Sequence, residues 1–241
     1  MEEHGPISGM RIVSLVPSST ETLLALGANV IACTRFCEQP AIQQVGGTKN
    51  PDVESIVRLA PDLVVMDREE NRREHAEALR SAGVVLYVSD VKTISDALEV
   101  VAELASLVGR GSHSAEEMAI PSELALSPRL VFVPIWRRPW MSIGPSTYAG
   151  SLLDHLGLSL VTFGGEEAYP SFDLADVESQ HPEVILVPSE PYEFTDGHLA
   201  EMRAAVRDAA IVRVDGRDLF WWGIRTPSAM VRLSARLSGL E

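Results

Sequence analysis

The chain has 241 residues, of which 46% are hydrophobic and 22% charged, a balance typical of folded globular proteins and not of disordered ones. Its formal net charge of −14 argues against nucleic acid or an anionic membrane surface as the main partner. Two cysteines are too few for a disulfide framework, and no apolar run approaches the ~18 residues that a membrane span needs.

The N-terminal sequence is acidic where a secretory signal would be basic, because it reads Met1-Glu2-Glu3-His4. No apolar segment of the kind found in signal peptides follows it. We therefore expect a cytoplasmic location for the chain as written, and an extracytoplasmic one if an upstream signal has been trimmed.

The first half of the chain alternates apolar strands with helices. Strands are predicted over 11–16, 30–34, 63–66 and 84–88, helices over 18–26, 52–59 and 71–81, and a long loop over 35–50. The hydroxyl groups of Ser18, Ser19 and Thr20 are expected to cap the first helix, which Gly27 ends. Because the strands read as continuous apolar runs, we expect a parallel sheet that helices cover on both faces.

A long amphipathic helix is predicted between the two halves, over 93–108. Its apolar residues recur at helical spacing and are Ile94, Ala97, Leu98, Val101, Leu104, Ala105 and Val108. A break is expected over 109–114, and helix is expected to resume over 115–126 despite Pro121.

The second half repeats the pattern of the first, with strands predicted over 130–133, 184–187 and 211–214 and helices over 146–156 and 173–180. The stretch that begins Pro182-Glu183 is similar to the one that begins Pro61-Asp62, about half the chain earlier. The sequence therefore predicts an α/β protein with two related lobes. We place an N-terminal lobe at 1–90, a bridging helical segment at 91–127 and a C-terminal lobe at 128–241.

All four tryptophans fall in two short segments, 135–141 and 220–225, each mixed with arginine and broken by proline or glycine. Core tryptophans are usually spread through helices and strands. Tryptophans that gather in loops beside guanidinium groups more often form a wall against a flat, partly apolar ligand. The alternative interpretation is that both segments are simply well-packed loops.

Five motifs in order resemble the helical-backbone (class III) periplasmic substrate-binding proteins of ABC importers. The stretch 11–21, RIVSLVPSSTE, followed by Leu26-Gly27, is similar to the opening of that family. Four further stretches resemble the cobalamin-binding branch of that family: 36–40 (FCEQP), 45–47 (VGG), 135–137 (IWR) and 221–225 (WWGIR). The similarity extends over roughly residues 10 to 238.

The resemblance implies two Rossmann-like lobes with parallel sheets, bridged by a long α-helix, with a ligand cleft between them. It implies a non-enzymatic protein that binds cobalamin or a related corrinoid, with no catalytic residues and no catalytic cofactor. Aromatic faces would cover the rim of the corrin, while arginines and loop amides would bond its amides and phosphate. The candidate ligand-binding residues are Pro17, Ser18, Ser19, Phe36, Cys37, Gly47, Asp67, Trp136, Arg137, Trp140, Tyr192, Trp221, Trp222 and Arg225.

The family docks on an ABC importer permease through one acidic residue on the surface of each lobe. Glu54, seven residues before Pro61, matches the first position. Ala175, seven residues before Pro182, does not match the second, although Asp173 and Asp176 lie beside it, and Asp176 is the candidate substitute. We therefore expect weak docking or none, and no membrane span or nucleic-acid partner.

Three other functions stay open. A heme or ferric-siderophore binding protein would use the same cleft. A cytoplasmic corrinoid-handling enzyme would need a polar catalytic pair, and a protein-interaction module would use the tryptophans against another chain. The six histidines have no metal-ligand spacing, so no metal site is predicted. Cys33 is expected to be a buried thiol, and Cys37 is a candidate soft ligand for cobalt.

Overall fold

The structure is a computed structural model that describes residues 9–110, 118–121, 124–165 and 167–239, and the chain divides into two compact units. Unit 1 comprises Met1–Val91, Ser95–Ala119 and Trp222–Ile224, and unit 2 comprises Lys92–Ile94, Ile120–Trp221 and Arg225–Glu241. Within the described ranges, none of the helices is both long and apolar enough to cross a membrane.

Unit 1 is built on a parallel five-stranded sheet of order β3-β2-β1-β4-β5. Its strands are β1 (Ile12–Ser14), β2 (Val30–Cys33), β3 (Gln43–Gln44), β4 (Leu63–Asp67) and β5 (Leu86–Ser89). Its helices are α1 (Pro17–Ala25), the 3-10 helix η1 (Arg35–Cys37), α2 (Val53–Arg58), α3 (Arg73–Ser81) and α4 (Ile94–Leu107), the last with its first residue in unit 2. The predicted α/β class with parallel sheets is confirmed.

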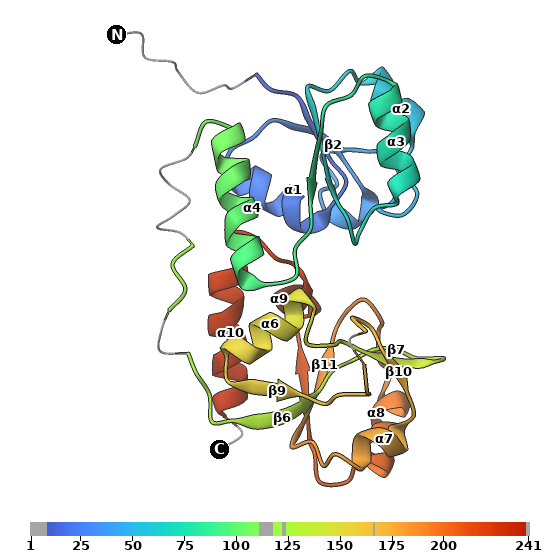
Figure 1. The fold of residues 1–241 in the computed structure, drawn as a ribbon, viewed down its shortest axis with the longest axis vertical. Coiled ribbons are helices and arrows are strands. Elements are labelled where there is room, and N and C mark those ends of the chain that lie inside the picture. The colour runs from blue at the N-terminus through green and yellow to red at the C-terminus, as the bar shows by residue number, and fades with distance from the viewer. Residues whose placement is uncertain (1–8, 111–117, 122–123, 166, 240–241) are drawn as a thin grey trace. The chain divides into compact units, whose positions relative to one another are not determined.

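Helices cover both faces of this sheet, as the apolar strands require (Figure 1). On one face, Ile56 of α2 and Leu79 of α3 pack in one buried cluster with Val64 and Met66 of β4. On the other face lie α1 and α4. The helix predicted over 93–108 is confirmed as α4, and its predicted apolar positions are buried except for Leu98, which is half-buried.

Two local predictions in unit 1 and the segment after it differ from the structure. The segment 35–50 is not one long loop, because it contains η1 and β3. Helix does not resume in the described parts of 115–126, which are 118–121 and 124–126. Pro121 lies in this stretch, and proline removes a backbone donor and clashes with the preceding turn of a helix. The predicted break over 109–114 falls largely outside the described residues.

Unit 2 contains two sheets. The parallel sheet has the order β12-β11-β6-β9, with β6 (Arg129–Phe132), β9 (Leu158–Leu160), β11 (Val184–Pro188) and β12 (Ala210–Val214). The antiparallel sheet has the order β10-β8-β7, with β7 (Pro134–Trp136), β8 (Trp140–Ser142) and β10 (Ser171–Phe172). The helices are α6 (Tyr148–His155), α7 (Leu174–Glu178), α8 (Asp196–Ala205), α9 (Gly216–Phe220) and α10 (Thr226–Ser238).

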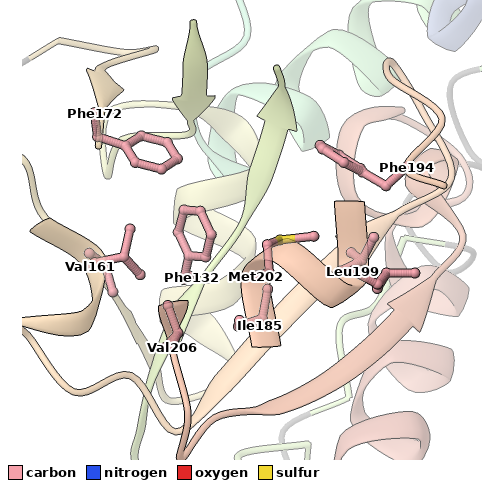
Figure 2. Close-up of a cluster of buried hydrophobic side chains, with 10 residues drawn as sticks. Phe132, Val161, Phe172, Ile185, Phe194, Leu199, Met202 and Val206 are labelled. Carbon is pink, nitrogen blue, oxygen red and sulfur yellow. The ribbon is translucent and has the colours of Figure 1, made fainter. Parts of the chain in front are cut away.

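An aromatic core lies on the face of the parallel sheet that α7 and α8 cover (Figures 1 and 2). Phe132 of β6 is fully buried, and its ring meets the ring of Phe172 edge to face at 5.0 Å between centroids. Figure 2 shows Met202 and Leu199 of α8 in the same cluster, with Ile185 of β11 beneath them. Helices α6, α9 and α10 lie on the opposite face of the sheet.

The predicted repeat between the two halves is visible in the hydrogen bonds of the structure. The N–H of Asp62 donates to the carbonyl of Arg11, and the N–H of Glu183 donates to the carbonyl of Leu130, each at 2.9 Å. In return, the N–H of Arg11 donates to the Asp62 carboxylate at 2.7 Å, and the N–H of Leu130 donates to the Glu183 carboxylate at 3.2 Å. Each acidic residue therefore fixes the start of one parallel strand beside another.

Candidate ligand-binding site

The first tryptophan segment forms a β-hairpin in unit 2, and not the loop that its proline and arginines suggested. Strands β7 and β8 pair antiparallel, and Trp136 lies opposite Met141. The turn between them contains Arg138, whose φ is 75°, and Pro139. The hairpin holds the Trp136 indole 44% exposed and the Trp140 indole half-buried. A large exposed indole on regular backbone is unusual in a core-forming role and typical of a binding surface.

A layer of aromatic rings supports this hairpin. The Trp136 ring lies 5.2 Å from the ring of Tyr192, which follows β11, and Tyr192 lies 4.9 Å from Phe194. The buried Phe194 ring stacks on Trp140 at 6.0 Å with an angle of 6° between the planes. We call Trp136, Trp140 and Tyr192, with Phe194 beneath them, the aromatic surface. Its rings fix one another in place, so little side-chain entropy remains to be lost on binding.

An ion pair holds the arginine of the hairpin over this layer. The Arg137 guanidinium lies 5.4 Å from the centroid of the Trp140 ring. Its Nε and Nη2 donate to one carboxylate oxygen of Glu201 on α8, at 3.0 and 2.8 Å. The Arg137 side chain is 19% exposed, so the pair is partly shielded from water. Arg137, one of the predicted ligand-binding residues, therefore lies beside the aromatic surface with its charge neutralised by the Glu201 carboxylate.

The second tryptophan segment is divided between the two units. Trp221, in unit 2, donates from Nε1 to the Glu190 carboxylate at 2.8 Å, and the Arg225 guanidinium lies 5.3 Å from its ring centroid. Trp222 is assigned to unit 1 and is only 5% exposed. Within unit 1 the following Gly223 has a φ of 114°, and a side chain there would collide with the Thr22 hydroxyl. Trp222 is thus packed, whereas Trp221 and Arg225 are half-buried.

In unit 1, the predicted loop presents Phe36 on the 3-10 helix η1. The Phe36 ring is 50% exposed, and the Arg35 guanidinium lies 4.8 Å from its centroid. Gly47 lies against this ring, because a Cβ atom at that position would be 3.1 Å from Phe36 Cε2. The two predicted residues are therefore neighbours, and the glycine gives the ring room. That Phe36 and all four tryptophans line one cleft stays a prediction.

The prediction that serine and threonine hydroxyls cap the first helix is wrong. Helix α1 begins at Pro17, whose fixed φ suits the first helical position, and Val16 is the capping residue without a side-chain bond. Ser18 and Ser19 therefore lie inside the first turn and are 5% and 0% exposed. Ser19 Oγ is buried without a hydrogen-bond partner among the described residues.

The two cysteines are both free and both buried in unit 1, so the expectation of a buried Cys33 is confirmed. Thr20 Oγ1 donates to Cys37 Sγ at 3.2 Å, and Thr34 Oγ1 lies 3.2 Å from the same sulfur. A hydrogen bond from Cys33, with those from the two threonines, lowers the pKa of Cys37, and the same contact raises the pKa of Cys33. Because Cys37 is only 2% exposed, its sulfur faces the interior of the unit.

Asp67 ends β4 and organises the turn that follows it. Its carboxylate is 2% exposed and accepts hydrogen bonds from Ser89 Oγ at 2.7 Å and from the N–H of Glu69 at 2.8 Å. Asn71 accepts from the N–H of Asp67 and donates to the carbonyl of Thr48 at 2.9 Å, which ties this turn to the Gly47 loop. Desolvation raises the pKa of Asp67, and the hydrogen bonds oppose only part of that rise.

Replacing Asp67 with asparagine should reduce the pH dependence of folding stability. The pKa of Asp67 is raised above its ordinary 3.8 in the folded state, so the folded protein holds the proton more tightly than the unfolded chain does. The contribution of this group to stability is therefore highest below 3.8 and falls as pH rises through the folded-state pKa. Asparagine stays neutral and keeps an acceptor oxygen. The free energy of unfolding of Asp67→Asn should therefore rise relative to that of the wild type between pH 4 and pH 7.

Urea unfolding of both proteins at the two pH values measures this gain. Asp208→Asn, at an exposed position in unit 2, is the matched control. The prediction would be contradicted if the free energy of unfolding of the wild type rose relative to that of Asp67→Asn as the pH rises.

A family model described as periplasmic binding protein matches residues 12–213, which is most of the chain. This chain belongs to the periplasmic binding protein family. Among its relatives, the vitamin B12-binding protein of Photorhabdus laumondii is 25% identical over 193 residues, which cover 74% of this chain and 70% of that protein. The vitamin B12-binding protein of Vibrio cholerae is 23% identical over 223 residues, covering 84% and 80%.

Solved structures of periplasmic binding proteins share the fold. The periplasmic vitamin B12-binding protein of Vibrio cholerae superposes with a TM-score of 0.76 at 20% identity, covering 94% of this chain and 96% of that one. The periplasmic heme-binding protein of Roseiflexus sp. RS-1 superposes with a TM-score of 0.80 at 22% identity, covering 95% and 98%. At these identities the likeness shows the fold, which confirms the predicted architecture class.

The two docking positions predicted for this periplasmic binding protein differ in their surroundings. Glu54 lies on α2 with its side chain 90% exposed and only a long contact of 3.7 Å to Arg58. Asp176 lies on α7, and its carboxylate accepts from the N–H of Asp173 at 3.1 Å in a capping box. Ala175 beside it is exposed. The substitute acid is therefore engaged in holding the start of its own helix.

Sequence reasoning missed Phe194 and Glu201, which support the aromatic surface of this periplasmic binding protein. Tyr192 and Phe194 are two residues apart, a spacing that places side chains on the same side of an extended segment. That signal was available. Glu201 is 64 residues from Arg137, and nothing in the sequence pairs them. Within the described ranges, no three or more His, Cys, Asp and Glu side chains are grouped so as to hold a metal ion.

Proposed function

We propose that this periplasmic binding protein binds cobalamin or a related corrinoid and has no enzymatic role. The observation that carries the proposal is the half-exposed Trp136 indole on the aromatic surface of unit 2. The two relatives described above, which are vitamin B12-binding proteins, support the choice of ligand. A corrinoid is a flat macrocycle with an apolar rim and amide side arms, and it needs both aromatic and polar contacts.

The aromatic surface offers those contacts within a few ångströms of one another. Trp136 and Tyr192 supply ring faces and edges for the apolar rim of a corrin. Their indole and phenol groups add polar atoms that can bond amides of the ligand. In unit 1, the resemblance assigns a further ligand contact to Phe36, which is half-exposed.

Titration of the purified protein with cyanocobalamin, heme and a ferric siderophore tests the proposal. We expect saturable binding of cyanocobalamin at one ligand per chain, followed by calorimetry and by the visible absorption of the bound corrin. Failure of the protein to bind any corrinoid would contradict the proposal. Chemical conversion of a bound corrinoid with turnover would instead identify a corrinoid-handling enzyme.

Heme is the second candidate, and the side chains around the aromatic surface favour it. Tyr192 and His198 have ring centroids 5.7 Å apart, and both residue types can ligate heme iron. His198 Nδ1 accepts the N–H of Thr195, so the proton of the neutral imidazole lies on Nε2, and Tyr192 is the better candidate for an iron ligand. A shifted Soret band in the heme titration, abolished in Tyr192→Phe, would favour heme over cobalamin.

For transport, we propose that corrinoid binding here is separable from stimulation of an ABC importer. Two-point docking gains affinity from effective concentration, and that gain is lost when one point is missing. Glu54 supplies one exposed carboxylate, whereas Ala175 supplies none and Asp176 is held in a capping box. A corrinoid-loaded protein should therefore engage a cobalamin importer weakly or not at all.

Reconstitution with a cobalamin importer from the same organism measures this engagement as uptake into proteoliposomes. We expect little stimulation by the wild type and a gain in Ala175→Glu, which adds a carboxylate at an exposed site. Glu54→Ala in the Ala175→Glu background should remove the gain. Strong stimulation by the wild type that Glu54→Ala abolishes would contradict the prediction and identify an ordinary transport receptor.

A further inference from the structure

Unit 1 contains a pocket of about 550 Å³ whose charged lining is almost entirely cationic. Four arginines line it: Arg68 after β4, Arg72 and Arg73 at the start of α3, and Arg80 near its end. The apolar wall includes Val88 of β5, which is 37% exposed. The chain has a net charge of −14, so four guanidinium groups around one pocket make this region positive in an otherwise acidic protein.

The carboxylates near these arginines do not occupy the pocket. Asp67, the one acidic residue of the lining, is 2% exposed and its oxygens accept from Ser89 and from backbone N–H groups. Arg68 pairs with Asp90 at 3.3 Å, and Arg72 and Arg73 pair with Glu74 and Glu77 of α3. The side chains of these three pairs are 37–90% exposed. Such solvated pairs contribute little and are easily exchanged for a better anion.

Two of the arginines flank the N-terminus of a nine-residue helix. Arg72 is the N-cap residue of α3 and makes no capping hydrogen bond through its side chain. The N–H groups of the first helical turn and the positive end of the helix dipole favour a negative charge at such a terminus. Arg68 comes from the preceding turn and Arg80 from two turns further along α3, so positive charge approaches the pocket from two elements.

We propose that this pocket is a binding site for a small anion that carries a diphosphate group. Guanidinium groups bind phosphate oxygens in bidentate geometry, and a diphosphate has enough oxygens for several of them at once. The volume lies in the range of sites for nucleotide-sized ligands. All the lining residues belong to unit 1, and among them only Asp67 is also a candidate ligand-binding residue for a corrinoid.

Calorimetric titration of the full chain with pyrophosphate and with ADP tests the site at low ionic strength. Pyrophosphate should bind saturably, and its affinity should fall as sodium chloride is raised. The double variant Arg72→Gln/Arg80→Gln should bind pyrophosphate at least about tenfold more weakly, because two charge-assisted contacts are lost. Arg58→Gln is the matched control, since Arg58 is an exposed arginine of unit 1 outside the pocket and should leave binding unchanged.

The two probes separate the possible sources of the diphosphate. Tighter binding of ADP than of pyrophosphate would identify a nucleotide site, whereas equal affinities would identify a site for the phosphate groups alone. Thermal unfolding of the double variant should match the wild type because both side chains are exposed. Absence of saturable binding by both probes, or binding that the folded double variant fully retains, would overturn the proposal whatever the cobalamin titration shows.

Discussion

Replacing Trp136 with alanine should weaken cobalamin binding by about 1–3 kcal/mol, which is a loss of roughly 5- to 150-fold in affinity. The indole is 44% exposed in the free protein, so it has surface to bury against a ligand. Its edge contact with Tyr192 holds it in one orientation before the ligand arrives. Truncation therefore removes both contact area and preorganisation. Equilibrium titration of cyanocobalamin against both proteins measures the difference.

Two further variants decide whether the effect belongs to the aromatic surface. Trp136→Phe keeps an aromatic ring on the hairpin and should recover part of the loss. Tyr169→Ala removes another exposed aromatic ring of unit 2, 38% exposed and outside the aromatic surface, and should leave affinity unchanged. Full cobalamin affinity in Trp136→Ala, with the fold intact, would remove the aromatic surface from the proposed site.

The fold of unit 1 follows closely from the sequence because its buried strands are apolar throughout and its helices are bounded by clear signals. Asp52 caps α2 as its position predicts, with its carboxylate accepting from the N–H of Ser55 at 3.0 Å. The predicted start of α1, at Ser18, is one residue late, because a proline also suits the position after a strand, whereas Pro17 begins the helix. Both interpretations fit the fixed φ of proline.

Unit 2 could be predicted only in part, for reasons that lie in the length of its elements. Strands β9 and β10 have three and two residues, too few for any periodicity to appear. Helix α10 is different, since its buried Met230, Leu233 and Leu237 have helical spacing that was available in the sequence. The hairpin of β7 and β8 was hidden because its proline and arginines are typical of loops.

The candidate site shows a different limit of sequence reasoning. Clustering of the tryptophans singles out both segments but cannot tell Trp136, which is half-exposed, from Trp222, which is packed. Exposure depends on contacts with residues far along the chain. Ile224, two residues after Trp222, donates its N–H to the hydroxyl of Thr22, which is 202 residues away.

Replacing Phe132 with alanine should lower the free energy of unfolding by about 3–5 kcal/mol, the usual cost of removing a buried phenyl ring. Phe132 is fully buried, and its ring contacts both Phe163 and Phe172 edge to face. Figure 2 shows the Phe132 ring beside Phe172 within the cluster, so its loss should open a space there. The cluster cannot collapse easily into that space, because Phe172 also packs against Trp140 and Phe163.

The matched control is Phe36→Ala, the same chemical change at a ring that is 50% exposed. It should cost less than about 1 kcal/mol of stability, because much of that ring is already in water and little cavity can form. Urea unfolding followed by circular dichroism gives both values, with unit 2 as the part of the chain that Phe132→Ala should affect first. Equal losses in the two variants would contradict the prediction, since they would mean that the burial of Phe132 contributes nothing beyond that of a half-exposed ring. A large loss in Phe132→Ala should also weaken cobalamin binding, because Phe172 and Trp140 connect this core to the aromatic surface.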